Sequence, residues 1–185
     1  MSNAIIMQQT GGPEVLQWQP FDPGPPQAGE AIVRHEAVGL NFIDVYHRTG
    51  LYPIGDLPAI PGMEGAGRVE AVGSGVSEVA EGDRVAYAGL PPGAYAERRR
   101  IPAHRLVKLP DAIPAPQAAA MMLQGMTARY LLKGCTTVRA GQTVLLHAAA
   151  GGVGLIASQW ARHLGATVIG TVGTEAKAKL AKAHG

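Results

Sequence analysis

Short apolar runs separated by glycine and proline turns fill the first 110 residues of the chain. These runs predict β-strands at residues 4–8, 15–18, 30–40, 65–73, 83–88 and 94–101. Many short strands with such turns are typical of a small barrel or sandwich. One segment differs, because residues 41–50 (NFIDVYHRTG) predict a short helix that Asn41 caps and Gly50 ends.

The pattern becomes helical from Pro114 onward. All 14 prolines lie at or before Pro116, so the chain changes character there. We expect one helix over residues 114–124, ended by Gly125, and a second over residues 127–134, capped by Thr127. This change predicts a first domain at residues 1–126 and a second at residues 127–185.

Residues 143–185 predict a strand, a helix, a second strand and a second helix. Both strands, at residues 143–148 and 166–172, are apolar almost throughout, as in parallel sheets that are buried on both faces. Gly165 ends the first helix and Thr174 caps the second. The predicted fold is therefore a mainly-β domain followed by an α/β domain with a parallel sheet.

A glycine-rich turn joins the first of these strands to its helix, in the stretch HAAAGGVGLIASQW. Ala149, Gly151 and Gly154 have the spacing of the G-x-G-x-x-G turn, with alanine in the first position. The second glycine lets a pyrophosphate approach the backbone, and the third lets helix and strand pack closely. We predict a dinucleotide phosphate site at Gly151, Gly152, Val153 and Gly154. The alternative is a turn that serves packing alone.

The end of the second strand indicates which dinucleotide would bind. NAD sites place an acidic residue there for the ribose hydroxyl, whereas this chain has Val172 and Gly173. Gly173 and Thr174 offer donors at a helix N-terminus, and Lys177 follows in its first turn. This pattern favours NADPH, whose 2′-phosphate a carboxylate would repel. The alternatives are that Lys177 is an ordinary surface lysine and that Glu175 weakens the preference.

Composition excludes several other classes of protein. With 46% hydrophobic and 16% charged residues the chain can form a globular core, and its net charge of +2 does not indicate a nucleic-acid partner. The basic run ERRR at residues 97–100 is interpreted as a solvated strand face. No apolar run reaches the length of a membrane span, and the start lacks a signal-peptide pattern. A single cysteine, Cys135, favours a reduced, cytoplasmic protein.

Several stretches together resemble one family. In chain order they are GGPEVL, GLNFIDVYHRTGLYP, PGMEGAGRVEAVGSGV, GDRVAYA, GAYAE, AAAMMLQGMTARYLL, HAAAGGVGLIASQWARHLGA and GTVGTEAKA. They resemble the quinone oxidoreductase (zeta-crystallin-like) group of the medium-chain dehydrogenases/reductases, over nearly the whole chain. The resemblance implies a GroES-like barrel domain followed by a Rossmann domain, hydride transfer from NADPH to a small quinone, and a homodimer for a full-length protein.

The resemblance also implies site residues. Asn41 and Tyr52 would position the nicotinamide and the quinone. The cofactor would contact Asn41, Phe42, Ile43, Asp44, Val45, Tyr46, Thr127 and Tyr130, besides Gly151, Gly152, Val153, Gly154, Gly173, Thr174 and Lys177. Each has a simpler alternative: Asn41 as a helix cap, Asp44 as a local partner, and the aromatic residues and Thr127 as packing groups.

No metal site is predicted. Zinc-dependent relatives carry a cysteine where this chain has Asn41 and a His-Glu pair where it has Met63-Glu64. One cysteine and histidines without an i, i+4 pair cannot supply a catalytic or structural zinc site. His47 and His147 are expected to be polar groups with satisfied hydrogen bonds.

Alternatives to quinone reduction remain open at this stage. One is an enoyl or enone reductase of the same family; the others are a non-catalytic, crystallin-like protein that binds the cofactor, and an inactive fragment. A nucleotide-binding half has three parallel strands, and the sequence predicts two, so we expect an incomplete Rossmann domain. Such a chain alone is expected to aggregate or to bind NADPH weakly.

Overall fold

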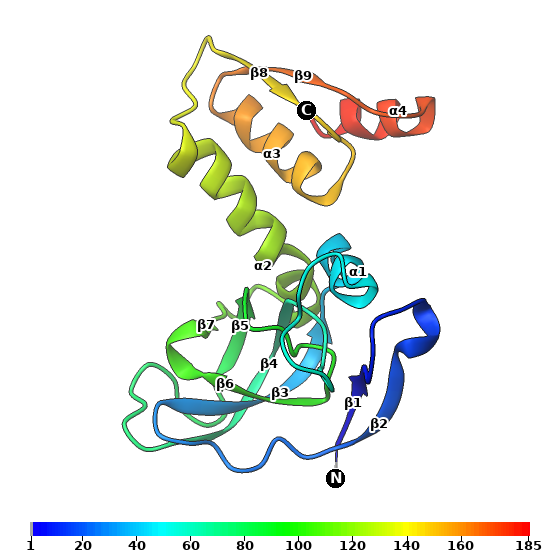
Figure 1. Ribbon diagram of the computed structural model, residues 1–185. Helices are drawn as coiled ribbons and strands as arrows, with labels where there is room; N and C mark the ends of the chain where they lie inside the picture. The colour runs from blue at the N-terminus through cyan, green and yellow to red at the C-terminus, as the bar shows by residue number, and fades with distance from the viewer. Residues whose placement is uncertain (1) are drawn as a thin grey trace. The chain divides into compact units, whose positions relative to one another are not determined.

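The computed structural model describes residues 2–185, which form two compact units, residues 2–123 and residues 124–185. The division falls within the long helix α2, Ala115–Arg129 (Figure 1). The separate roles of the two predicted domains stay a prediction.

Unit 1 is built on antiparallel sheets. A two-stranded sheet pairs β1 (Ser2–Ile6) with β2 (Gln17–Phe21). A five-stranded sheet has the order β6-β3-β4-β5-β7. Its strands are β3 (Glu30–Val38), β4 (Glu64–Val72), β5 (Arg84–Ala88), β6 (Arg98–Pro102) and β7 (Val107–Lys108). Short 3-10 turns lie at Pro13–Val15 and Ala103–Arg105, and helix α1 covers Phe42–Thr49.

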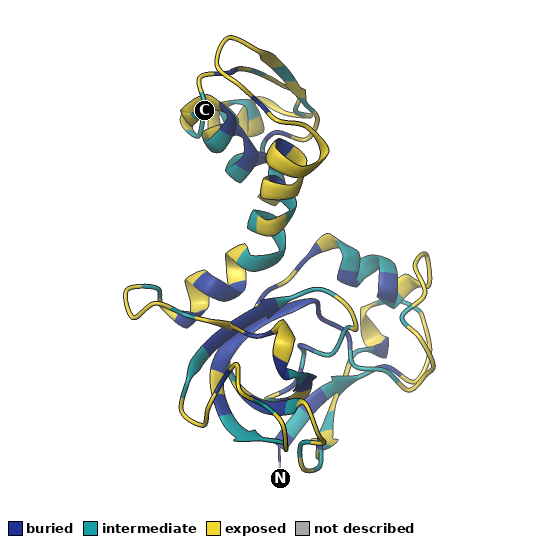
Figure 2. Ribbon diagram, turned by 90° about the vertical axis from the view of Figure 1, so that its left-hand side faces the viewer, coloured by how far each residue is buried: buried dark blue, intermediate teal, exposed yellow. Residues whose placement is uncertain are grey.

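Alternating apolar residues of these strands form the main core of unit 1. Val33, Val69, Val85 and Ile101 are almost fully buried and pack together, as the dark central strands of Figure 2 show. The period-2 pattern sends these side chains to one face and polar side chains to the other. Among residues 2–185, no strand pair closes this sheet into the predicted barrel, and β6 and β7 form its edges.

Two predicted strands of unit 1 were partly wrong. Val15 belongs to a 3-10 turn that Pro13 starts, so β2 begins at Gln17. Ala94 to Glu97 form an irregular segment with one bridge between Ala4 and Ala96, and regular pairing starts only at Arg98. The positive φ of 139° at Gly93 turns the chain immediately before that segment.

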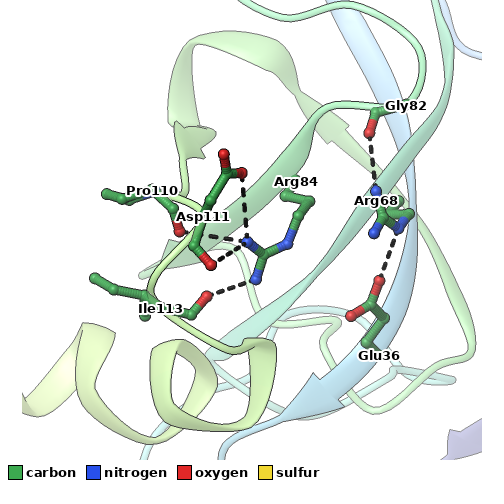
Figure 3. A network of polar contacts seen from close by, with 7 residues as sticks. All are labelled: Glu36, Arg68, Gly82, Arg84, Pro110, Asp111 and Ile113. Atoms are coloured by element: carbon green, nitrogen blue, oxygen red, sulfur yellow. Dashed lines mark hydrogen bonds and ion pairs between the residues drawn. The ribbon is translucent and has the colours of Figure 1, made fainter.

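Arginines of β4 and β5 connect the sheet to its surrounding loops (Figure 3). Arg84 donates to the carbonyl oxygens of Pro110, Asp111 and Ile113, at 3.3, 3.3 and 2.5 Å. These bonds fix the segment that leads into α2. Arg68 donates to the Gly82 carbonyl at 3.3 Å and pairs with Glu36 at 3.1 Å, on the exposed side of the sheet.

A partly buried histidine, His35, lies within the same sheet. The His35 ring has Nδ1 2.6 Å from the Ala96 carbonyl oxygen and Nε2 2.7 Å from the Tyr87 hydroxyl. A carbonyl oxygen only accepts, so Nδ1 carries the proton and Nε2 accepts from Tyr87 in the neutral ring. Burial, opposed by the Ala96 bond and aided by the Arg99 charge, lowers the pKa of His35 to about 4.

We expect His35 to make the first unit less stable in acid. The unfolded chain protonates this histidine near pH 6.5 and the folded chain only near pH 4, so stability falls as the pH is lowered through that window. The loss due to His35 is up to about 3 kcal/mol. Urea unfolding between pH 7 and 4 measures it. His35→Gln should reduce the dependence of the free energy of unfolding on pH. His104→Gln, which replaces an exposed histidine, should leave that dependence unchanged. Equal slopes in all three proteins contradict the expectation.

Helix α2 corrects the prediction of two helices in this region. It continues through Gly125 to Arg129 and then passes into a π-helical segment, η3, at Tyr130–Cys135. Gly125 has no positive φ and so does not end the helix, and Thr127 lies inside it and caps nothing. A glycine within a helix costs only about 1 kcal/mol, which the packing of alanines such as Ala118 and Ala128 offsets. Among the described residues, no helix is long and apolar enough to cross a membrane.

Unit 2 contains the predicted strand-helix-strand-helix order. It consists of β8 (Thr143–Leu146), α3 (Gly152–His163), β9 (Thr167–Gly170) and α4 (Glu175–Ala183). β8 and β9 are parallel, as predicted, and α3 packs on them through Ala157 and Ala161 (Figure 1). The expectation that both strands are fully buried was wrong, since Leu145 and Ile169 are 60% and 53% exposed. In the described residues α3 covers one face of this sheet.

Candidate functional site

The N-terminus of α1 carries a buried polar network. Asn41 caps the helix, and its backbone N–H donates to Asp44 Oδ2 at 2.9 Å, which is one half of a capping box. The Tyr95 hydroxyl donates to the same oxygen at 2.8 Å. The Asn41 side-chain amide donates to Glu64 Oε1 at 2.6 Å, and the Leu123 N–H donates to Glu64 Oε2 at 2.7 Å. The network thus links α1 to β4 and to the first part of α2.

Burial controls the acidity of this network. Asn41, Asp44 and Glu64 are 8%, 5% and 0% exposed. Desolvation raises the pKa of both carboxyl groups, against the hydrogen bonds that they accept. Desolvation and the Asp44 carboxylate also raise the pKa of Tyr95, which stays a hydrogen-bond donor. The Glu64 carboxylate thus orients the Asn41 side-chain amide, and the Asp44 carboxylate binds the Asn41 backbone.

Two atoms of this region are buried without a hydrogen-bond partner among the described residues. They are Asp44 Oδ1 and His47 Nδ1, three residues apart on α1. The prediction that His47 is a satisfied polar group was therefore wrong for this atom. His147, by contrast, has its Nδ1 3.0 Å from the Thr171 hydroxyl.

Aromatic side chains form an exposed cluster beside this network. Phe42 and Tyr46 meet edge to face with ring centres 5.2 Å apart, and Tyr46 and Tyr52 lie 5.1 Å apart. Phe42 is 72% exposed and Tyr52 is 48% exposed. The backbone N–H of Tyr52 donates to the Tyr46 carbonyl at 3.2 Å and fixes the loop after α1. Ile43 and Val45 are partly buried on the same helix. Exposed aromatic faces of this kind suit a planar ring.

The glycine-rich turn of unit 2 has the local geometry of a phosphate site. Gly151 is the N-cap of α3, with φ −81° and ψ 170°, and the first N–H groups of the helix, at Gly152 and Val153, have no acceptor within it. A Cβ at Gly151 would be 3.1 Å from the Ala148 carbonyl oxygen, its only neighbour. A Cβ at Gly154 would instead be 2.6 Å from the Ala149 carbonyl oxygen and nearer still to that of Ala148. The turn is open at Gly151 and closely packed at Gly154.

The ends of β8 and β9 lie next to this turn. The parallel register pairs Leu146 with Gly170, so His147 and Thr171 follow side by side, and their hydrogen bond ties the two strand ends. Thr174 caps α4, as predicted, and accepts from the Lys177 N–H at 3.2 Å. Gly173 has open space around it. Gly173, Thr174 and Lys177 therefore gather at one helix N-terminus, where a phosphate is favoured.

Thr127 and Tyr130 lie elsewhere in unit 2. Thr127 is a partly buried residue of α2, and Tyr130 starts the π-helical segment and is 62% exposed. The Cys135 thiol interacts with the Tyr130 hydroxyl and raises the pKa of Tyr130. Asn41 to Tyr46 and Tyr52 belong to unit 1, and the other predicted site residues belong to unit 2.

Glu64, Tyr95 and His147 are residues of these units that the sequence did not assign to the site. Glu64 and Tyr95 meet α1 through pairings across 23 and 51 residues, which no local pattern reveals. His147 could have been found, because it lies near the carboxyl end of a predicted parallel strand. Within residues 2–185, no three histidine, cysteine, aspartate or glutamate side chains are grouped so that they could hold a metal ion.

Comparison with known proteins agrees with this architecture. Residues 27–111 match the alcohol dehydrogenase GroES-like domain. The chain is 53% identical to a quinone oxidoreductase of Pseudomonas aeruginosa and 45% identical to a 2-haloacrylate reductase of a Burkholderia species; each match covers 100% of this chain and 57% of the relative. The crystal structure of Escherichia coli quinone oxidoreductase complexed with NADPH superposes with a TM-score of 0.96 at 49% identity, over 99% of this chain and 56% of that one.

These matches show what the chain is similar to and how far the similarity extends. The identity runs through both units, since the aligned region covers the whole chain. The chain spans little more than half the length of the relatives that it matches. The chain is therefore similar to quinone oxidoreductases over little more than half of their length, and its residues 27–111 match the alcohol dehydrogenase GroES-like domain.

Proposed function

We propose that this chain supplies the quinone-positioning half and the phosphate-binding turn of an oxidoreductase that transfers hydride from NADPH to a quinone without zinc. The observation that carries the proposal is the pairing, in one chain, of the exposed Phe42–Tyr46–Tyr52 aromatic cluster with the open glycine turn at Gly151. Relatives named quinone oxidoreductases, one of them complexed with NADPH, support it.

The residues of unit 2 fit a bound NADPH. Gly151 leaves room for a pyrophosphate, and the N–H groups of Gly152 and Val153 are free to donate to it. The Lys177 side chain, in the first turn of α4, would pair with a 2′-phosphate, and neither Val172 nor Gly173 brings a carboxylate. When bound, NADPH supplies the hydride.

The residues of unit 1 would orient the acceptor. The aromatic cluster binds the planar quinone by stacking, and the Asn41 amide, held by Glu64, fixes a polar group of the nicotinamide or the quinone. A quinone is electrophilic without a Lewis acid, so the reaction needs no metal to polarise it. The hydride and one proton together convert the quinone to the hydroquinone. Water supplies this proton, either directly or through the Tyr52 hydroxyl, which water then reprotonates. We also propose that the longer protein is a homodimer.

A chimera tests this function. Residues 1–185 are joined to the remaining part of the Pseudomonas aeruginosa relative, and oxidation of NADPH and NADH is followed with 1,4-benzoquinone. We expect turnover that prefers NADPH at least tenfold in kcat/KM, about 1.4 kcal/mol of discrimination. Zinc chelation should leave the rate unchanged. A folded chimera that binds NADPH without turnover would instead support a non-catalytic protein.

A second candidate is reduction of an activated alkene. The 45% identity to a 2-haloacrylate reductase over the whole chain favours it. In the same assay, 2-chloroacrylate replaces benzoquinone. A higher kcat/KM with the acrylate than with benzoquinone would assign the chain to this second activity.

A further inference from the structure

A pocket of unit 1 contains an arginine that lacks an acidic partner. The pocket has a volume of about 350 Å³ and lies between β6 and two proline-rich loops. Its walls include Phe21, Pro58, Pro91 and the three consecutive arginines Arg98, Arg99 and Arg100. None of the residues proposed for hydride transfer lines it.

The three arginines differ in their pairing. Arg98 binds Glu70, and Arg100 pairs with Glu30 at 3.2 Å, so both of these charges are neutralised on the sheet. Arg99 is only 6% exposed, and within residues 2–185 no carboxylate lies within ion-pair distance of it. The interpretation of this run as a solvated strand face was therefore wrong for Arg99.

The contacts of Arg99 leave its charge uncompensated. Its Nη2 donates to the carbonyl oxygens of Pro91 and Pro92 at 2.6 and 3.3 Å, and the guanidinium lies 4.7 Å from the centre of the Tyr87 ring. Its Nη1 is buried and donates to no acceptor among the described residues. Carbonyl and ring contacts orient a guanidinium but carry no negative charge. A buried cation without an anion is costly, whereas one paired with an oxyanion is not.

We propose that this pocket binds a small oxyanion, a carboxylate or a phosphate, through Arg99. The oxyanion supplies the negative charge that Arg99 lacks, and the planar guanidinium favours a carboxylate or phosphate over a halide. Gly93 belongs to the same site, since a Cβ there would be 3.3 Å from Arg99 Nε. The prolines restrict the pocket to a small ligand. This inference goes beyond the proposed hydride transfer and needs neither NADPH nor a quinone.

Thermal unfolding of the 185-residue chain tests the proposal at constant ionic strength. Sodium phosphate or sodium acetate replaces sodium chloride in steps. We expect a saturable rise of the melting temperature, about 4 °C at ten times the dissociation constant. A rise with phosphate alone identifies a phosphate site, and a rise with acetate a carboxylate site. A melting temperature that is the same in all three salts overturns the proposal.

Two variants locate the effect. Arg99→Met keeps the length of the side chain and removes the charge, so the rise should disappear. Arg68→Met removes one charge from an exposed ion pair outside the pocket and should keep the full rise. An equal rise in Arg99→Met overturns the proposal. If Arg99→Met does not fold, amide NMR of the wild-type chain decides: saturable shifts at Gly93 and Arg99 support the site, and their absence overturns it.

Discussion

Replacing Gly154 by alanine is expected to destabilise unit 2 and to weaken NADPH binding together. A Cβ at this position would overlap the carbonyl oxygens of Ala148 and Ala149, which are backbone atoms that cannot move without displacing the turn. Forcing a methyl group into such a site costs about 1–3 kcal/mol. The displaced turn would also misdirect the N–H groups of α3, and losing one or two charge-assisted bonds weakens affinity roughly tenfold to a hundredfold.

Gly151→Ala is the matched control, because the two glycines have different surroundings. Gly151 has an ordinary φ of −81° and one neighbour at 3.1 Å, so alanine there should change stability by less than about 1 kcal/mol. The new methyl group still stands where the pyrophosphate approaches, so affinity should fall. Urea unfolding and NADPH titration of the chimera measure both quantities. A Gly154→Ala protein with unchanged stability contradicts the packing role that we assign to Gly154.

The sequence predicted the ends of several helices well, where local signals are strong. Thr174 caps α4, Gly165 follows α3 with a φ of 83°, and Gly50 ends α1 with a φ of 79°. These features depend on a few adjacent residues and on conformations that glycine or threonine favours. The break predicted at Gly125 failed because packing along α2 outweighs the weak helix propensity of one glycine.

The polar groups of unit 1 were less predictable, because they depend on residues far apart in the chain. Helix spacing places Asn41 next to Asp44, but only the folded sheet brings Glu64 and Tyr95 to them. Charge patterning placed Arg99 on the surface with its neighbours, whereas strand alternation turns it inward over Tyr87. A period-2 interpretation of ERRR would have separated Arg99 from Arg98 and Arg100.

Truncating Glu64 is expected to cost unit 1 about 3–5 kcal/mol. Glu64 is fully buried, and each of its oxygens accepts one hydrogen bond, from the Asn41 amide and from the Leu123 N–H. Glu64→Ala leaves a cavity and withdraws both acceptors. The Asn41 amide also loses the partner that orients it, so in the chimera we expect kcat/KM for benzoquinone to fall at least tenfold. Urea unfolding and initial rates measure the two effects.

Glu64→Gln separates the hydrogen bonds from the charge. Glutamine keeps the volume, accepts from Leu123 through Oε1, and can donate to Asn41 if that amide turns over, so its cost should stay near 1 kcal/mol. Burial raises the pKa of Glu64 above its ordinary value of 4.5. The stabilisation that this shift gives the folded state is therefore fully present below pH 4.5 and is lost as the pH rises through the folded-state pKa. Glu64→Gln removes this loss. Its stability relative to the wild-type chain should therefore improve as the pH increases from 4.5, and a constant difference would show that Glu64 does not titrate within the network.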